Sequence, residues 1–407
     1  AVIKSSPLVQ IINKLFILLL FSLSLFSCKK EDETIEECDN TCIPDTLIVV
    51  DTLIIDETQP HQNPVINQAL NWFTQMQNDN GLLESSANSN FVSLYDNALS
   101  VLVFIANEDY EKAESIFDFF NARIESELQS GAGGFSQFRD AQGIPSGNRW
   151  LGDNAWMLIA LNNYHEKTGN NTYSQLSTAI ENWIISLQDT DGGLWGGTRT
   201  DGSQIGKVTE GMIDAFNAVS GYTSFHSNLL QYLENDRWND SQQLLISWPN
   251  NTYEYALDNF PWGYCVFEDF PGSTLFAANM FWCTQQATQN NLSVTGYCFD
   301  IDRDVVWLEG TGEMVVAFQK AGDIISANFY LQEMEKVFSG SPGVTNGLGL
   351  PYATNLGTGY GADLLWTGSD TAPCVSSTAW YIFGMLQFDP FEVGYEKNIP
   401  QEDKFWL

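Results

Sequence analysis

Five carboxylate side chains stand at matching points of a repeated pattern in this chain of 407 residues. Each lies at the start of an apolar segment with helical spacing, or one helical turn further on: Asp96, Asp153, Glu210, Glu309 and Glu313. Carboxyl groups that converge in one cavity can act as proton donor and as base or nucleophile in the hydrolysis of a glycosidic bond. The simpler role for an acid at such a place is to cap the helix or to make a structural hydrogen bond.

The helix positions suggest how the two roles could be divided. A carboxylate in the first turn of a helix is stabilised as an anion by about 0.3–1 kcal/mol, so we expect Asp153 and Asp96 to be bases. Glu309 and Glu313 are four residues apart and share one helix face, where each negative charge raises the pKa of the other. One of these two glutamates is therefore the expected proton donor.

Aromatic residues make up 13% of the chain and include 13 tryptophans. Flat aromatic faces with a polar edge can stack against sugar rings, although most aromatic residues simply pack the core. We expect the substrate to contact the following residues near the helix starts: Tyr95, Asn154, Trp156, Trp195, Trp262, Tyr264, Trp307, Tyr360 and Trp380. Trp262 and Tyr264, with Glu268 and Asp269, form an aromatic and acidic patch that could line a subsite ahead of the fourth of these apolar helices.

The elements that position these residues repeat along the chain. The interval is 57 residues from Asp96 to Asp153 and again from Asp153 to Glu210. Further helix starts are expected near residues 270–284, at Leu308 and at Ser376. Helices that are apolar nearly all round are buried on both sides, whereas the segments between them are amphipathic.

This alternation predicts an all-α fold, an (α/α)6 toroid of six helical hairpins over residues 64–395. Its inner helices share one direction, so their N-termini and acids should meet at one rim. A first helix over Pro64–Met76 would cover the seam of the ring. An open α-solenoid is the structural alternative. Residues 396–407 are expected to form a C-terminal tail.

Three segments carry a resemblance to a known family. They are Gly152–Tyr164 followed by Thr168-Gly169, Val306–Met314, and Ser377–Phe383 with Asp389-Pro390-Phe391. Together with the repeat, they resemble the six-hairpin glycosidase superfamily, which implies the toroid and, for most members, glycoside hydrolysis. Related toroids serve polysaccharide lyases and terpenoid cyclases. Residues 188–195 are similar to the cyclase repeat motif, but the Asp-x-Asp-Asp acid motif is missing from the chain.

The N-terminal residues predict where in the cell the protein is located. Lys4 and Lys14 precede an apolar run over residues 15–26, which is typical of a secretory signal. Leu25-Phe26-Ser27-Cys28 resembles the lipobox of bacterial lipoproteins, and the acidic residues after it resemble the surface-export tag of Bacteroidetes lipoproteins. We therefore expect a signal peptide over residues 1–27, lipidation of Cys28, an acidic flexible linker over 28–63, and a lipid-anchored protein of the outer membrane or cell surface. An ordinary signal peptide is the alternative.

Composition narrows the possible partners. The formal net charge of −34 disfavours nucleic acid, which is bound by clustered Lys and Arg. Three histidines and the lack of a C-x-x-C pair disfavour zinc, and no cofactor or metal is expected. Alternating acids over 300–304 could hold calcium, but a solvated loop is the favoured interpretation. Cys38 and Cys42 are candidates for a disulfide. The Gly-rich loop over residues 343–361 is a candidate for a segment that covers the cleft.

The sequence thus predicts a surface-anchored glycoside hydrolase that acts on a polysaccharide or oligosaccharide by carboxylate acid–base catalysis with inversion. A polysaccharide lyase is less favoured, since few basic residues lie at the helix starts and the nearest are Arg149 and Lys207. A non-catalytic glycan-binding lipoprotein remains the third alternative. The sequence specifies neither the glycan nor the oligomeric state.

Overall fold

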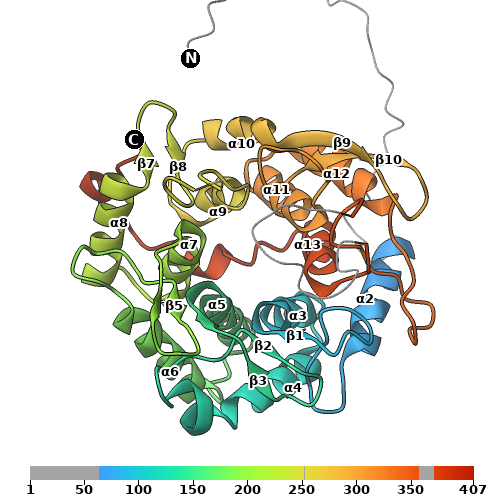
Figure 1. Ribbon diagram of the computed structural model, residues 1–407, viewed down its shortest axis with the longest axis horizontal. Coiled ribbons are helices and arrows are strands. Elements are labelled where there is room, and N and C mark those ends of the chain that lie inside the picture. Colours follow the sequence, from blue (N-terminus) through green and yellow to red (C-terminus); the bar gives the residue numbers. More distant parts are fainter. Residues whose placement is uncertain (1–63, 252, 357–370) are drawn as a thin grey trace, which may run out of the picture. The chain divides into compact units, whose positions relative to one another are not determined.

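The apolar helices form a closed inner ring in the computed structural model, which describes residues 64–251, 253–356 and 371–407 (Figure 1). Each inner helix packs against the next one along the chain, and the last packs back against the first. In the described residues this ring consists of α3 (Leu94–Ala106), α5 (Leu151–Thr168), α7 (Thr209–Ala218), α9 (Asn259–Val266), α11 (Leu308–Lys320) and α13 (Val375–Leu386). The predicted toroid is confirmed, and the open solenoid is excluded because α13 contacts α3.

Burial follows the difference in sequence pattern between inner and outer helices. Nearly every residue of α3 is buried, whereas α4 buries one face, which includes Ala113, Ile116 and Phe120. Side chains on one stripe of an amphipathic helix need only one neighbouring layer, so α4 lies outside the ring. The outer helices in the described part of the chain are α2 (Pro64–Met76), α4 (Tyr110–Asn121), α6 (Ser174–Ser186), α8 (Ser224–Asp236), α10 (Ser273–Ala277) and α12 (Ile324–Glu335).

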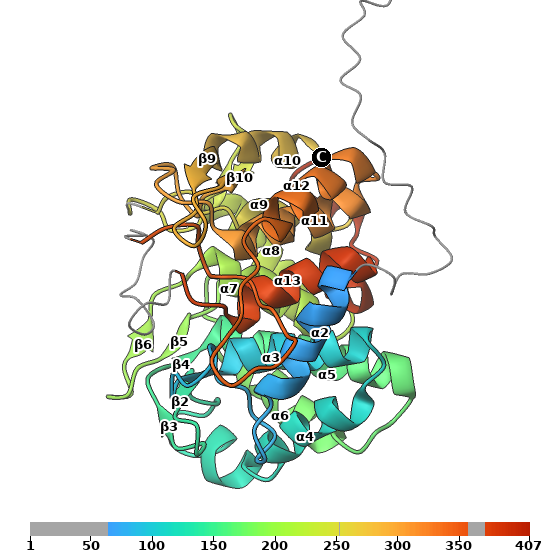
Figure 2. The same cartoon turned by 90° about the vertical axis from the view of Figure 1, so that its right-hand side faces the viewer.

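Helix α2 covers the seam as predicted. It lies against α13, the last inner helix, and completes the outer layer where the ring closes (Figure 2). Its fully buried Trp72 donates an indole hydrogen bond of 2.8 Å to Ser341 Oγ, which ties the start of the domain to a loop 269 residues later.

The prediction for the fourth inner helix was wrong. That helix is α9, which begins at Asn259, and not a helix near residues 270–284. It was missed because α9 spans only eight residues and contains Pro261 and Gly263, both poor formers of helix interiors. Residues 270–286 form the short outer helix α10, a 3₁₀ turn η3 (Ala278–Phe281) and strand β9 (Trp282–Gln286).

Short antiparallel strands connect the helices at the end where the inner helices begin. They pair as β1 (Val92–Ser93), β2 (Phe138–Arg139) and β3 (Pro145–Ser146); β4 (Arg149–Trp150), β5 (Gly197–Thr198) and β6 (Gln204–Ile205); β7 (Trp238–Asn239) and β8 (Leu244–Leu245); β9 and β10 (Ser293–Tyr297). A π-helical turn η2 (Ile124–Leu128) follows α4. Strands β1 and β4 run directly into α3 and α5, so they fix where these helices begin.

Two asparagines fasten the preceding loops to the inner helices in the same way. Asn97 accepts a hydrogen bond from the backbone N–H of Leu83 and donates to its carbonyl, both at 3.0 Å. Asn154 does the same with Phe135, at 2.9 Å and 3.1 Å. Both asparagines are fully buried, so the amide of Asn154, predicted to contact substrate, is occupied by the protein's own backbone.

The C-terminal segment blocks the far end of the ring. Phe391 is fully buried and its ring packs against Trp156, Trp262 and Trp380, with centroids 5.0, 6.1 and 6.4 Å apart. Asn217 holds this segment by donating a 2.9 Å hydrogen bond to the Phe391 carbonyl. The 3₁₀ turns η4 (Glu392–Gly394) and η5 (Gln401–Asp403) follow.

Residues 396–407, predicted as a tail, also pack onto the helical body. Trp406 is 3% exposed and stacks near Phe267, with ring centroids 5.3 Å apart. Lys397 is buried and donates to the carbonyl of Asn217 at the end of α7, at 2.9 Å. The last residues therefore help to close the bottom of the ring.

Several predictions concern residues outside the described ranges. These are the signal over residues 1–27, Cys28, the linker over 28–63 with Cys38 and Cys42, and part of the Gly-rich loop. Within the described ranges, no helix combines the length and apolar character required to cross a bilayer. The described cysteines Cys265, Cys283, Cys298 and Cys374 are buried free thiols.

Candidate active site

A cavity of about 370 Å³ opens at the N-terminal ends of the inner helices. Four of the five predicted catalytic acids line it: Asp96 from α3, Asp153 from α5, Glu210 from α7 and Glu309 from α11. These residues are 213 positions apart in the sequence at their extremes, and the common direction of the inner helices brings them together. The predicted convergence of acids at one rim is therefore confirmed.

Two further acids of the cavity were not predicted. Asp214 lies four residues after Glu210 on α7, and Asp258 directly precedes α9. Both had a signal in the sequence. Asp214 repeats the spacing of Glu309 and Glu313, and Asp258-Asn259 repeats the Asp-Asn pair found at Asp96 and Asp153.

The fifth predicted acid, Glu313, lies one turn deeper than Glu309. It is 1% exposed and does not line the cavity itself. Neither of its carboxyl oxygens has a hydrogen-bond partner among the described residues. Burial is the largest cause of its raised pKa, and the negative charges of Asp258, Glu309 and Asp214 raise the pKa further.

Burial governs the proton affinity of the acids at the rim. It raises the pKa of Asp96 to about 7, and the Ser85 hydroxyl only partly opposes this. Burial likewise raises the pKa of Asp153 to about 7, with the negative charge of Asp96 adding to the effect. The loss of hydration in this cavity therefore outweighs the helix dipole in setting these two pKa values. The role of Asp153 and Asp96 as bases stays a prediction.

Glu309 is the acid of the rim with the highest pKa for which a value is resolved. Burial raises its pKa to about 8, while hydrogen bonds with Tyr95 and Ser376 act in the opposite direction. Tyr95 is itself held in place, since its hydroxyl accepts the indole N–H of Trp380 at 3.1 Å. The expected mutual repulsion of Glu309 and Glu313 contributes to the pKa of Glu313, but burial is the larger cause for both.

Aromatic side chains form much of the cavity wall. Of the nine residues predicted to contact substrate, four line it: Tyr95, Trp156, Trp262 and Trp307. Three further wall residues were not predicted, namely Phe138, Trp150 and Phe299. Tyr352 also lines the cavity and belongs to the Gly-rich loop that was expected to cover the cleft. Phe138 and Trp150 come from β2 and β4, whose short strands cannot be recognised by sequence periodicity.

The remaining predicted contacts lie away from the cavity. Trp195 does not line it and instead has the Lys207 ammonium 4.9 Å from its ring centroid. Trp380 is buried behind Tyr95 and packs against Trp156. Tyr264 lies within α9 and outside the cavity lining, and Tyr360 falls outside the described residues.

The acidic members of the predicted aromatic patch do not join the site. Glu268 accepts backbone hydrogen bonds from Lys397 and Asn398, at 2.7 and 2.6 Å. Asp269 pairs with Lys404 at 2.7 Å. Both acids therefore hold the C-terminal segment, and the patch does not precede the fourth inner helix, because Trp262 and Tyr264 are part of it.

Metal-binding geometry occurs elsewhere in the described residues. Cys298, Asp300 and Asp302 have potential ligand atoms within 4.8 Å of one another, and they form the only such group found there. The acids of the cavity do not meet this criterion. The Asp300–Asp304 loop remains best interpreted as a loop in which Asp300 and Asp302 accept backbone N–H bonds of 3.2 and 3.1 Å.

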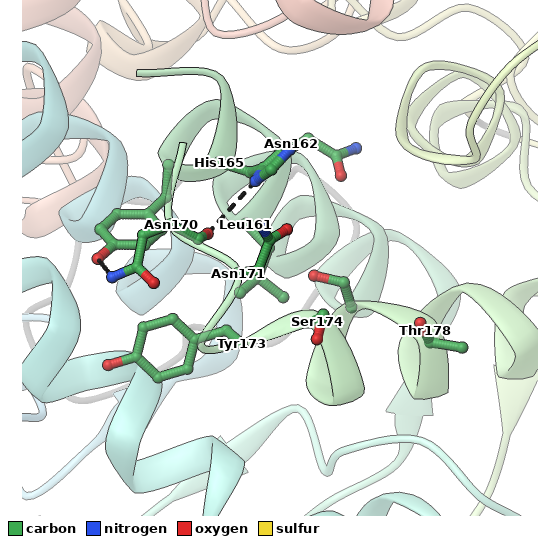
Figure 3. Close-up of a pocket in the computed structure, with 10 residues that line it drawn as sticks. Leu161, Asn162, His165, Asn170, Asn171, Tyr173, Ser174 and Thr178 are labelled. Carbon is green, nitrogen blue, oxygen red and sulfur yellow. Dashed lines mark hydrogen bonds between the residues drawn. The ribbon is translucent and has the colours of Figure 1, made fainter. Parts of the chain in front are cut away.

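A smaller cavity of about 180 Å³ lies where α5 ends and α6 begins (Figure 3). Its wall includes Tyr164, His165, Asn170, Asn171 and Tyr173, and none of its lining residues is an acid. It therefore lacks the carboxyl pair that glycoside hydrolysis uses.

Comparisons with known proteins agree with the toroid. No protein-family model matches the chain, and no curated protein sequence matches it. Among solved structures, a glycosidase in complex with glucose has a TM-score of 0.55 at 11% identity, covering 81% of this chain and 96% of its own.

Two other solved structures show the same likeness. A cellobiose 2-epimerase from Bacillus thermoamylovorans has a TM-score of 0.53 at 12% identity, covering 79% of this chain and 97% of its own. An α-amylase from Clostridium perfringens has a TM-score of 0.56 at 9% identity, with coverages of 80% and 97%. The protein thus shares the helical toroid of these solved structures, and at these identities the likeness establishes the fold alone.

Proposed function

We propose that the protein is a glycoside hydrolase whose active site is the acid-lined cavity of the toroid. The observation that carries the proposal is the set of carboxyl groups with raised pKa values inside an aromatic wall. Glycoside hydrolysis needs one carboxyl that holds a proton near neutral pH and another that can be ionised there. The similar structures that act on sugars support a sugar substrate.

Glu309 is the proposed proton donor and Asp153 the proposed base. With a pKa of about 8, Glu309 is mostly protonated at pH 7, whereas Asp153 with a pKa of about 7 is ionised in half of the molecules. Tyr95 would orient Glu309 through their hydrogen bond. The buried indole N–H of Trp262 has no acceptor in the described residues and offers a donor to a sugar hydroxyl.

We further propose inversion of the anomeric carbon. Asp153 and Glu309 come from α5 and α11, which are separated by two helices on either side of the six-helix ring of the described residues. Carboxyl groups that face each other across a substrate leave room for a water molecule, as inverting enzymes need at about 6.5–9.5 Å separation. Anomeric product analysis by NMR during early turnover tests this point, and a retained configuration would contradict it.

Reducing-sugar release across a panel of glycans tests the function. General acid–base groups contribute about 10²–10⁴-fold to rate, so Glu309→Gln and Asp153→Asn should each lose at least about 100-fold. Glu234→Gln, an exposed acid on α8, is the matched control and should keep wild-type activity. Unchanged turnover in both site variants would remove the assignment.

A lyase is less well supported by the same cavity. Proton abstraction beside a uronate carboxylate needs a cation to neutralise that carboxylate, and the described lining residues include no Lys, Arg or His. A non-catalytic glycan-binding protein would use the aromatic wall with the acids as hydrogen-bond acceptors. Sugar binding without turnover, unaffected by Glu309→Gln, would favour that alternative.

The subcellular localisation of the protein is a separate proposal, which rests on the N-terminal sequence. We propose that Cys28 is lipidated and that residues 28–63 tether the toroid to the outer membrane or cell surface. A flexible chain of about 35 residues spans roughly 30–35 Å root-mean-square. A Cys28→Ser variant should move to the soluble fraction, and continued membrane association would contradict the lipid anchor.

A further inference from the structure

The cavity collects carboxyl groups without any cationic side chain to pair with them. Six carboxyl groups line it, and Glu313 lies directly behind them. The lining residues in the described part of the chain include no Lys, Arg or His. The ion pairs of the described residues all lie elsewhere and involve none of these seven acids.

Several acceptor atoms of this group are buried and unpartnered. One carboxyl oxygen of Asp214, one of Asp258 and both of Glu313 have no hydrogen-bond donor among the described residues, although these side chains are 2%, 9% and 1% exposed. Buried polar groups in proteins are nearly always satisfied, so unpartnered acceptors mark a place where a donor from outside is missing. Asp214 on α7 and Asp258, directly before α9, both line the cavity, and α7 packs against α9. The negative charge of Asp258 adds to the effect of burial in raising the pKa of Asp214.

The wall adds a second kind of attraction for a cation. Trp156 and Trp262 lie beside these acids, with their ring centroids 5.5 Å apart. The faces of aromatic rings attract ammonium groups, and aromatic cages lined with acids are the usual protein solution for binding organic cations.

An inorganic cation fits the arrangement less well. A bound divalent metal ion requires ligand oxygens about 2.0–2.6 Å from the ion, which keeps them within about 5 Å of each other. The cavity acids are not grouped so closely, since the described residues contain such a group only around Cys298. A ligand that spreads several donors over a sugar ring suits dispersed acceptors better than a single ion does.

We propose that the cavity is specific for a glycan unit with a free amino group, an unacetylated hexosamine, whose ammonium lies between Asp214 and Asp258. This inference rests on the proposed function and names its substrate class. The ammonium would donate to the unpartnered oxygens of the two aspartates against the faces of Trp156 and Trp262. The same carboxyl groups disfavour uronates and sulfated sugars, because the lining offers these anions no cationic partner.

Matched sugars test the proposal without knowledge of the linkage. We would measure affinity by calorimetry at pH 6.5 for nitrophenyl glycosides of glucosamine and galactosamine, in both anomeric forms. Each is compared with its N-acetylated and its neutral parent. At least one amino glycoside should bind about tenfold or more tightly than both counterparts, which corresponds to about 1.4 kcal/mol. Equal or weaker binding of all amino glycosides would overturn the proposal.

Substitutions of the two aspartates test where the ammonium group of the sugar binds. Asp214→Asn and Asp258→Asn should each reduce the preference for the amino glycoside over its neutral parent to about onefold, whereas Glu234→Gln on the surface of α8 should keep the full preference. Two separate aspartate variants keep the test valid if one of them does not fold. A preference that survives both substitutions would overturn the placement of the ammonium. Calcium binding that displaces the amino glycoside and is lost in both variants would overturn it in favour of a metal site.

Turnover separates this inference from the proposed function. Hydrolysis of neutral glycans without any preference for amino sugars would support the proposed hydrolase function and contradict the proposed specificity for amino sugars. Selective binding of amino glycosides with no hydrolysis of any glycan would support the proposed specificity and contradict the proposed hydrolase function.

Discussion

Replacing Glu309 by glutamine should change the stability of the protein in opposite directions at acid and alkaline pH. Burial raises the pKa of this carboxyl from 4.5 to about 8, so the folded protein binds the proton more tightly than the unfolded chain does. The resulting stabilisation is complete below about pH 4.5 and is lost as the pH rises through about 8. Glutamine does not ionise and avoids this loss.

The magnitude follows from the pKa. A tenfold change in proton affinity is worth about 1.4 kcal/mol, so the wild type should lose about 5 kcal/mol of unfolding free energy between pH 4.5 and pH 8.5. The weaker hydrogen bond of the amide with Tyr95 costs the variant about 1–2 kcal/mol at every pH. Glu309→Gln should therefore be more stable than wild type by about 3 kcal/mol at pH 8.5, and within about 1 kcal/mol of it at pH 5.

Urea unfolding and thermal melting at both pH values measure this difference. For the roughly 340 residues from residue 64 to the end, about 3 kcal/mol corresponds to a rise in Tm of about 4 °C. The exposed variant Glu234→Gln keeps Glu309 and should therefore stay within about 0.5 kcal/mol of wild type at both pH values. An equal destabilisation of Glu309→Gln at pH 5 and pH 8.5 would refute the reasoning, because it would mean that Glu309 carries no raised pKa in the folded protein.

Three further outcomes follow from the site and the ring. The pH profile of kcat/KM should rise through about 7 as Asp153 ionises and fall above about 8 as Glu309 loses its proton, and a profile still rising at pH 9 would contradict these roles. Asn154→Ala should lower the unfolding free energy by about 2–4 kcal/mol in urea titrations, because it leaves the backbone N–H and carbonyl of Phe135 unpaired in the interior. Phe391→Ala should cost about 3–5 kcal/mol by the same measurement through the cavity it leaves among three tryptophans, and a loss below about 1 kcal/mol would show that the C-terminal segment does not hold the ring.

The fold was predictable to the extent that the repeat was regular. Helices α3, α5 and α7 begin within a residue or two of the predicted points, because their apolar faces and first-turn acids recur every 57 residues. Helix α9 escaped prediction because eight residues with a proline and a glycine carry too little helical periodicity. Its position is determined by the neighbouring inner helices α7 and α11, which is tertiary information that no local pattern contains.

The site was predictable as a set of acids but not as a set of proton affinities. The spacing of Glu309 and Glu313 placed two acids on one face, and the same spacing would have found Asp214 after Glu210. The pKa of Asp153 could not be derived from the helix dipole, which is worth about 0.3–1 kcal/mol. The rise to about 7 reflects a burial cost of about 4 kcal/mol that depends on how far the closed ring excludes water.

The closure of the ring by Phe391 has a consequence for how a long carbohydrate could travel. With the far end filled by this side chain and the C-terminal segment, the central space of the described structure is a dead end with a single mouth. A polymer chain therefore cannot pass through the centre of the toroid from one face to the other. Under the proposed function, a glycan would enter and leave the cavity on the same side of the ring. We therefore expect short products released one encounter at a time, without sliding along the chain between cuts.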